Sequence, residues 1–564
     1  MKRFLTSRKL YQNAAVYLGS AWVVLEATNF FIMRYSLPEF IDEVVLTIAG
    51  FGLISLIVRS WFDSREATRD TTKIELILQS IIAFICFFTV FQVIKNPGQA
   101  STIIHAGDVK SIAVLPFKNS GDNENFDYFG DGFADDVIAR LSQSGEFRVI
   151  SPASSFRHRE EEIDIKKISK ELGVNNILQG NYFIQNHDVR INVKLINAQN
   201  NEILVARTFN GILEDMLSLQ SEVANGISGA LRVKLLSGFS SAAEKPRNIN
   251  IEAYENYQKG KSLFRKEYLS PNVFELSKEF FIKAISLDSM YADAYIGLAE
   301  ASYTKMLWGF ASFPEIASEL KSYATIACRI KPEAGEPYGI LGFIALNEYE
   351  WEEARNLLEK SISLNPNYPL SVYNYGLYFI LMANKEKAYE QLSRCITLDP
   401  LNNNYKILMT AARFQFNDND ESIEMATKIL QNEPSHDEAL FFIGINYASM
   451  GLYEQALETF LKRAHGAKTN FALGYTYAKT GQKQKAEEIL NNLLIRSKEG
   501  FVPPTQIALV YIGLGNYSSA LDFLEKAYIE NDGWLLQWTR HCNLYEPVRT
   551  DPRYKALLRI MKVG

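Results

Sequence analysis

The sequence lacks the residue patterns on which many enzymes and metal proteins depend. Its four cysteines, Cys86, Cys328, Cys395 and Cys542, form no CxxC pair, so we expect neither a zinc ribbon nor a thioredoxin-type motif. The six histidines include no HExxH sequence, which argues against a zinc hydrolase. No Walker or Rossmann phosphate loop, GxSxG sequence or kinase signature set appears either. We therefore expect no catalytic residue, no cofactor and no metal.

An excess of positive charge is also missing. The chain has 59 lysines and arginines against 65 aspartates and glutamates, which gives a net charge of −6. Proteins that bind nucleic acid are usually basic, so this balance does not favour a nucleic-acid partner. With 47% hydrophobic residues, the composition is ordinary for a globular protein, and 564 residues are enough for several domains.

Long apolar stretches are confined to the first hundred residues. Three of them, at about 14–33, 44–62 and 74–94, approach the roughly 20 residues that a membrane-spanning helix needs. Glu26 interrupts the first stretch, either as a polar contact between helices or as a functional intramembrane carboxylate. The pattern predicts a membrane domain over residues 1–95 with three transmembrane helices, and hence the lipid bilayer as one partner.

The basic residues between these stretches predict an orientation. The N-terminal tail and the second loop carry most of the nearby lysines and arginines, whereas the first loop is mainly acidic. Because basic loops stay on the cytoplasmic side, the N-terminus is expected to be cytoplasmic. Three spans then place everything after about residue 95 outside the cytoplasm.

A small α/β domain is predicted after a linker at 96–110. Apolar runs predict strands at 111–117 and 147–150 and three more strands within 175–209. Helical spacing or length predicts helices at 130–142, 163–172 and about 213–235. The resulting order, β-α-β-α-β-β-β-α, indicates a mixed sheet with helices packed on it over residues 111–236.

One acidic stretch in this domain has two readings. "FDYFGDGFADDVIARLS" (126–142) contains Asp127, Asp131, Asp135 and Asp136. A carboxylate at a helix start accepts free amide hydrogens and favours the positive end of the helix dipole, so Asp131 is expected to begin a helix. The alternative is an enzyme with a metal or acid–base site near Asp131. No histidine, cysteine or third well-placed ligand lies nearby, so we favour helix initiation.

Several consecutive motifs of this region resemble the TolB amino-terminal-like domain. They are "SIAVLPFKNSGDNENFDYFGDGFADDVIARLS", "VISPASSF", "ELGVNNILQGNYF" and "VRINVKLINAQNNEIL". In bacteria this domain often precedes tetratricopeptide repeats, and it occurs in membrane proteins with cyclase or winged-helix domains. The resemblance thus implies a bacterial inner (plasma) membrane protein whose domains lie in the periplasm. The tail before the first apolar stretch is only about 12 residues long, so neither a cyclase nor a DNA-binding domain is expected.

The C-terminal half repeats with a period of 34 residues. Prolines stand at 332, 366, 400 and 434, and this period is that of the tetratricopeptide repeat. Small residues recur where the two helices of a hairpin would approach, as in the pair Gly444 and Ala456. We expect a linker at 237–250, about eight repeats over 251–543 and a C-terminal cap at 544–564. Extra residues at 306–316 indicate either a longer helix pair or a binding loop.

These repeats make partner binding the expected function. A tetratricopeptide superhelix presents a groove formed mainly by first helices, and aromatic residues in a groove suit a peptide or helix. Six tyrosines on or near those helices are candidate contacts, although they could equally fill the interfaces between hairpins: Tyr338, Tyr373, Tyr405, Tyr447, Tyr475 and Tyr511.

The sequence as a whole predicts a multidomain protein, with three transmembrane helices, a small α/β domain and an all-α repeat superhelix. The leading interpretation is a non-catalytic, membrane-anchored scaffold or adaptor that binds protein partners. The alternatives are a transmembrane sensor that signals to a membrane or cytoplasmic partner, and the enzyme described above. The sequence does not predict an oligomeric state.

Overall fold

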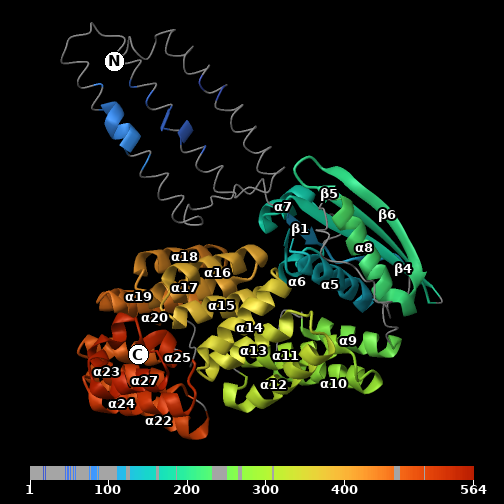
Figure 1. Ribbon diagram of the computed structural model, residues 1–564. Helices are drawn as coiled ribbons and strands as arrows, with labels where there is room; N and C mark the ends of the chain where they lie inside the picture. Colours follow the sequence, from blue (N-terminus) through green and yellow to red (C-terminus); the bar gives the residue numbers. More distant parts are fainter. Residues whose placement is uncertain are drawn as a thin grey trace. The chain divides into compact units, whose positions relative to one another are not determined.

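The computed structural model describes most of the chain from residue 111 onward. The described ranges are 111–121, 127–145, 147–159, 164–185, 187–230, 250–264, 270–307, 310–462, 470–500 and 502–563, with scattered positions between 17 and 87. The chain divides into two units, Met1–His105 and Ala106–Gly564. Figure 1 shows the described elements with their labels.

The first unit does not contain the predicted membrane domain in its described part. Among the described residues, no helix is long and apolar enough to cross a membrane. This finding contradicts the prediction of three transmembrane helices. Most of the ranges 14–33, 44–62 and 74–94, including Glu26, lie outside the described residues.

The predicted localisation depended on those three helices. The bacterial inner membrane, the cytoplasmic N-terminus and the periplasmic placement of later residues were all inferred from three spans, so they no longer have a basis. The described contacts of this unit include polar ones between helical positions. Tyr17 donates its hydroxyl to the carbonyl of Ala49 at 3.0 Å, and Gln79 Nε2 donates to the carbonyl of Ser55 at 3.0 Å.

The second unit begins with the small mixed-sheet domain that the sequence predicts. Its strands are β1 (Ser111–Val114), β2 (Lys118–Asn119), β3 (Arg148–Val149), β4 (Asn176–Gln185), β5 (Asp188–Asn197) and β6 (Glu202–Ile212). Its helices are α5 (Asp127–Gln143), α6 (Pro152–Ser155), α7 (Ile165–Leu172) and α8 (Met216–Ala230), with a 3-10 turn at Leu213–Asp215 before α8. We call residues 111–230 the α/β domain.

The sheet combines a parallel half with an antiparallel half. Strands follow the order β3-β1-β4-β5-β6, and β2 pairs with β4 off this path. β1 runs parallel to β3 and β4, whereas β4, β5 and β6 form an antiparallel meander. Apolar side chains of α5 and α8 pack on one face, and α7 packs on the other face near β1 (Figure 1). Beyond α7, the second face of β4, β5 and β6 is mostly exposed and carries both polar and apolar side chains.

Helix pairs make up the rest of the described chain. The first helices are α9 (Ile251–Phe264), α11 (Ala292–Leu307), α13 (Glu336–Asn347), α15 (Pro369–Leu381), α17 (Asn403–Gln415), α19 (Asp437–Ser449), α21 (Asn470–Lys479) and α23 (Pro504–Gly513). The second helices are α10 (Pro271–Leu287), α12 (Phe313–Ile330), α14 (Trp351–Leu364), α16 (Lys385–Leu398), α18 (Asn419–Asn432), α20 (Tyr453–Leu461), α22 (Lys483–Glu499) and α24 (Tyr517–Ile529). We call α9 to α24 the repeat array.

Small residues hold each helix pair together, as the sequence pattern predicts. A Cβ added at Gly342 would come within 2.7 Å of the Leu358 side chain, and one added at Gly444 would come within 2.5 Å of Phe460. Of the two arrangements predicted for the extra residues at 306–316, the structure shows the longer helix pair, because α11 and α12 have 16 and 18 residues. After α24 the chain continues through α25 (Trp534–Thr539), a 3-10 turn (Asn543–Tyr545), α26 (Glu546–Arg549) and α27 (Pro552–Ile560). We call residues 534–563 the C-terminal segment.

Candidate functional site

The acidic stretch of the α/β domain lies on α5, but it does not begin that helix as predicted. α5 starts at Asp127, so Asp131 lies one turn inside the helix and is not its N-cap. Both carboxylate oxygens of Asp131 accept hydrogen bonds from the Arg159 guanidinium, at 2.8 and 2.7 Å. The predicted N-cap is therefore wrong, because the helix begins upstream of its predicted start at residue 130.

The two later aspartates join the α/β domain to the first repeat helix, α9. Asp136 Oδ2 accepts hydrogen bonds from Gln220 Nε2 of α8 at 2.7 Å, and from Tyr254 Oη and Gln258 Nε2 of α9 at 3.1 Å each. Asp135, which is buried, forms an ion pair with Lys261 on α9. Three hydrogen bonds to one carboxylate satisfy it without a metal. This part of the cluster therefore joins two domains.

Two glycines in the same stretch allow close packing around α5. A Cβ at Gly130 would overlap the carbonyl oxygen of Phe117, and one at Gly132 would overlap the side chain of Gln258. Phe129 packs against Tyr182 of β4, with ring centroids 4.8 Å apart. The glycines and aromatics of the stretch thus place α5 between the sheet and α9.

A second contact joins the α/β domain to the middle of the repeat array. Ser154 Oγ donates to Asp399 Oδ1 at 2.5 Å and accepts from the Leu401 backbone N–H at 2.9 Å. The backbone N–H of Ser151 donates to the carbonyl of Leu398 at 2.9 Å. Ser154 and Asp399 are 0% and 2% exposed, so these polar groups depend on each other for hydrogen bonds.

Asn367 extends this contact to the turn after α14. Its side-chain Nδ2 donates to the carbonyls of Ser142 and Phe147 at 3.2 and 3.1 Å, and its Oδ1 accepts from the Val149 N–H at 3.3 Å. Arg148 Nη1 donates to the carbonyl of Thr397 at 2.8 Å. The α/β domain is therefore held along the turns that follow second helices, as well as at α9. Neither Asn367 nor Asp399 carried a signal that sequence analysis could have used.

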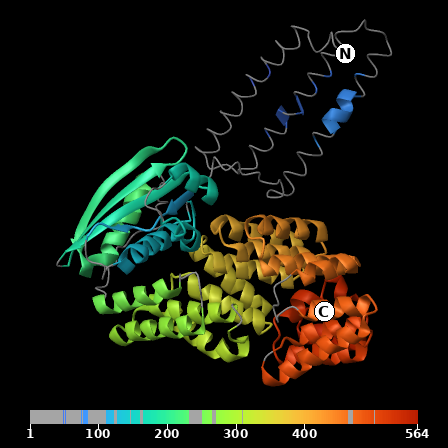
Figure 2. The same ribbon diagram turned by 180° about the vertical axis from the view of Figure 1, so that it is seen from behind.

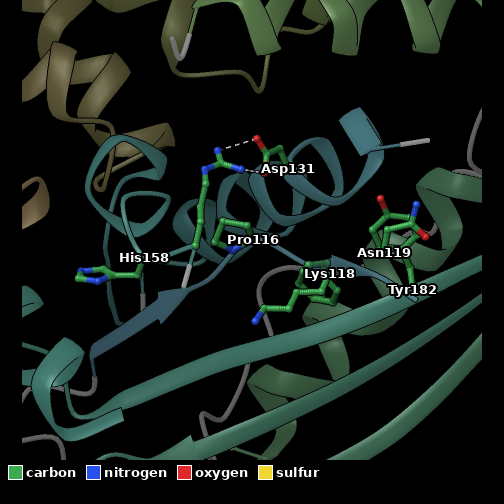
Figure 3. Close-up of a pocket in the computed structure, with 8 residues that line it drawn as sticks. Pro116, Lys118, Asn119, Asp131, His158 and Tyr182 are labelled. Carbon is green, nitrogen blue, oxygen red and sulfur yellow. Dashed lines mark hydrogen bonds and ion pairs between the residues drawn. The ribbon is translucent and has the colours of Figure 1, made fainter. Parts of the chain in front are cut away.

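A pocket of about 210 Å³ lies beside this acidic stretch, between the turn after β1, α5 and the segment after α6. Its polar lining comes from Lys118, Asn119, Asp131, His158, Arg159 and Tyr182. Figure 3 shows His158 and Tyr182 at opposite ends of it, so the polar groups do not converge on one point. Asp131 already neutralises Arg159 there. Within the described residues, no group of three or more His, Cys, Asp or Glu could hold a metal ion. This geometry does not favour the catalytic interpretation.

The six candidate tyrosines occupy two kinds of position. Tyr338, Tyr373 and Tyr475 are buried, at 8%, 9% and 5% exposed. Tyr405, Tyr447 and Tyr511 are half-buried. Tyr373 and Tyr405 are neighbours, with ring centroids 6.3 Å apart. Burial raises the pKa of Tyr373 and Tyr405, so both hydroxyls stay neutral at physiological pH.

Aromatic side chains on three first helices of the later repeats are covered by the chain itself. Trp538 of α25 packs against Phe414 of α17, Phe441 of α19 and Phe471 of α21, with centroid distances of 5.2, 6.1 and 6.1 Å. These three helices are first helices, whose inner face was expected to receive a partner. Trp538 is 4% exposed. The sequence does contain a signal for this helix, since Trp534 and Trp538 are four residues apart and share one face.

The rest of the C-terminal segment reaches back to the third, fourth and fifth helix pairs. Trp351 Nε1, at the start of α14, donates to the carbonyl of Met561 at 2.9 Å. Arg540 Nη1 donates to the carbonyl of Leu381 at 2.5 Å, and Asn417 Nδ2 donates to the carbonyl of His541 at 2.9 Å. The segment therefore covers turns between the helices of earlier pairs, in addition to the last pair.

Two family models match parts of the chain. Residues 108–226 match the second domain of HilA/YgeH-like transcriptional regulators, and residues 467–494 match the tetratricopeptide repeat. A curated Rhizobium meliloti (strain 1021) protein named "Putative adenylate cyclase 3" is 40% identical over 146 residues, which is 26% of this chain and 25% of that protein. This chain therefore spans about a quarter of the length of the curated relative that it matches.

Similar solved structures include repeat proteins and TolB, all at low TM-scores. The human IFIT1 dimer with m7Gppp-AAAA covers 55% of this chain and 77% of its own, with 16% identity and a TM-score of 0.35. A thermophilic TPR protein from Thermus thermophilus covers 37% and 99%, with 15% identity and a TM-score of 0.28. TolB from Acinetobacter baumannii covers 22% and 28%, with 17% identity and a TM-score of 0.17. The C-terminal part of this chain is an array of helix pairs, in which residues 467–494 match the tetratricopeptide repeat.

Proposed function

We propose that the protein is a non-catalytic scaffold that binds protein partners through its repeat array. The main support is the array itself, in which helix pairs are joined to the α/β domain at one side and to the C-terminal segment at the other. Tetratricopeptide arrays provide extended surfaces for protein partners. Adenylate cyclase activity is not part of the proposal, because the match covers only a quarter of the protein that carries this name.

The proposed contacts are the three half-buried candidate tyrosines, Tyr405, Tyr447 and Tyr511. Each exposes part of its ring while the rest packs on the array, and amphipathic aromatic side chains of this kind are common at interfaces. The buried Tyr338, Tyr373 and Tyr475 are proposed to support this surface from below. Because α25 occupies part of the groove, we propose that a partner contacts the remaining surface of the first helices without displacing α25.

The test is chemical crosslinking of the full chain in cells, followed by identification of the crosslinked proteins. A partner that is captured by the unaltered chain should be lost or much reduced with Tyr405→Ala, Tyr447→Ala and Tyr511→Ala combined. Tyr517→Ala is the matched control, since Tyr517 is an exposed tyrosine on a second helix, at 44% exposure. Equal capture by the triple variant and the control would reject these residues. If the unaltered chain captures no protein, the scaffold function itself is rejected.

A further inference from the structure

In the part of the chain that the structure describes, the β-sheet of the α/β domain ends in a long strand, β6, whose outer edge pairs with no further strand (Figure 2). β6 has eleven residues, of which only Phe209 is buried. Eight positions are exposed, among them the apolar residues Ile203 at 53%, Leu204 at 39% and Ile212 at 40%. Natural proteins usually protect such an edge with proline, lysine or a bulge within the strand. β6 contains no proline and no lysine, and its register shift against β5 lies at Leu204, near the start of the strand.

The backbone of β6 alternates between bonds to β5 and groups directed outward. The N–H of Leu213 donates to the carbonyl of the directly opposite residue, His187, at 2.9 Å. In an antiparallel ladder, hydrogen-bonded pairs occur at every second residue. Between Val205 and Leu213, the odd-numbered residues therefore bond to β5, and the even-numbered residues from Ala206 to Ile212 direct their N–H and C=O groups away from β5.

The exposed face of the sheet also carries a polar ladder that ends at this edge. Asn192 Nδ2 donates to Asn181 Oδ1 at 2.8 Å, and Thr208 Oγ1 donates to Asn192 Oδ1 at 2.7 Å. In the next row, Arg190 Nε donates to Asn210 Oδ1 at 3.1 Å. The ladder connects β4, β5 and β6, and it fixes the side chains at the edge in an ordered arrangement.

We propose that β6 is a self-association surface, where a second copy of this chain adds its own β6 in antiparallel orientation. A two-fold axis must pass through one residue of the strand so that outward-directed groups meet each other. An axis at Arg207 would place two arginines directly opposite each other, which is unfavourable. An axis at Thr208 avoids this and pairs Thr208 with its own copy.

Side-chain complementarity supports the axis at Thr208. It brings Leu204, at the register shift between β5 and β6, to the end of the strand where Ile212 of the second copy lies, so these two exposed apolar residues come close to each other. It also places Arg207 opposite Phe209, and Ala206 opposite Asn210, with no like charges facing each other between 204 and 212. Backbone hydrogen bonds provide affinity in such strand additions, and matching side chains provide specificity. This inference is independent of the partner proposed for the repeat array.

Cysteine crosslinking tests the register. Opposite residues in a hydrogen-bonded pair have Cα atoms about 5.5 Å apart, which suits a disulfide. Thr208→Cys, in a chain with Cys86→Ser and Cys328→Ser, should therefore form a disulfide-linked dimer on mild oxidation. Ala206→Cys alone should not, because its two copies would lie roughly 13 Å apart along the strands. A mixture of Ala206→Cys and Asn210→Cys chains should crosslink.

Self-association of the chain without added cysteines is the second measurement. An interface of this small size predicts a dissociation constant in about the micromolar range, to be measured by analytical ultracentrifugation. Leu204→Lys should weaken the dimer at least tenfold, while Leu276→Lys, at a similarly exposed leucine on α10, should leave it unchanged. Circular dichroism of both variants checks that they remain folded. A chain that stays monomeric, or a Leu204→Lys dimer of unchanged affinity, would overturn the proposal.

Discussion

At the scale of single residues, the aspartates of "FDYFGDGFADDVIARLS" differ in what surrounds them. Asp131 faces Arg159, whose side chain is 53% exposed, so water competes for their ion pair. Asp136 instead accepts hydrogen bonds from three side chains, and two of these, Gln220 and Gln258, are 0% and 1% exposed. Asp131 and Asp136 are close in the sequence, but Asp131 forms an ion pair at the surface, whereas Asp136 lies at a buried junction.

Replacement of these two aspartates should have unequal effects. Asp136→Ala removes the shared acceptor of three buried donors, and we expect it to lower the free energy of unfolding by about 2–3 kcal/mol. Asp131→Ala breaks an exposed pair, for which about 0–1 kcal/mol is expected. Urea unfolding followed by circular dichroism measures both. Equal losses in the two variants would show that the two carboxylates have the same role.

The lowered pKa of His541 predicts that the free energy of unfolding depends on pH. Burial, followed by the nearby Arg540 and Arg549, lowers the pKa of His541 to about 4 in the folded chain. The folded chain therefore favours the neutral ring. The stability that depends on this neutral ring is fully present above the ordinary pKa of about 6.5, and it is lost as the pH falls toward 4. Between about pH 7 and pH 5, urea midpoints should fall less in His541→Gln than in the unaltered chain. The same fall in both would contradict the assignment.

At the scale of elements, α25 is the helix whose position depends most on distant contacts. Its Trp538 touches aromatic side chains of three first helices that lie far upstream in the sequence. A short helix of this kind has little stability of its own and is held by packing. We therefore expect its contacts to contribute to the stability of the repeats around it.

Trp538→Ala should consequently destabilise the array strongly. Large-to-small replacement of a buried aromatic residue costs about 3–5 kcal/mol, because a cavity remains where the side chain packed. Tyr517→Ala, at an exposed aromatic residue of α24, should change the free energy of unfolding by no more than about 0.5 kcal/mol. Thermal and urea unfolding of the full chain compare the two. A small effect of Trp538→Ala would mean that α25 is not part of the stable core.

The sequence predicted those elements whose signals are local. Prolines 34 residues apart and small residues such as Gly342 mark helix pairs, because each pair is specified by its own hairpin. Alternation in β5 likewise predicted the meander. The junction residues Asp399 and Asn367 could not be predicted, since their partners lie more than 200 residues away. The apolar stretches before residue 95 predicted membrane spans, but no such helix is found among the described residues.

At the scale of the second unit, the α/β domain and the repeat array share buried polar contacts at two places. One lies at α9 around Asp136, and the other lies at the turn after α16, where Ser154 bonds to Asp399. Neither contact can be lost on one side without leaving a buried group unpaired on the other. We therefore expect the α/β domain and the array to unfold together.

Asp399→Ala tests this coupling. It should remove about 1–3 kcal/mol of stability and increase amide hydrogen exchange at 148–155, within the α/β domain, although the substitution is in the array. Glu424→Ala, which breaks an exposed pair with Lys428 within α18, serves as the control and should have only local effects. Hydrogen exchange measured by mass spectrometry resolves both regions. Exchange that rises only within the array would contradict the coupling.

The contact between Trp351 and Met561 has a consequence for how the protein is made. A ribosome that still holds residues 534–563 also withholds the partners of α14, of α15 and of Asn417 in the turn after α17, which were synthesised long before. The middle of the array therefore reaches its final form only after residues 534–563 have left the ribosome. A stop codon before residue 534 would destabilise repeats that are fully encoded upstream of it, and would make them sensitive to cellular proteases.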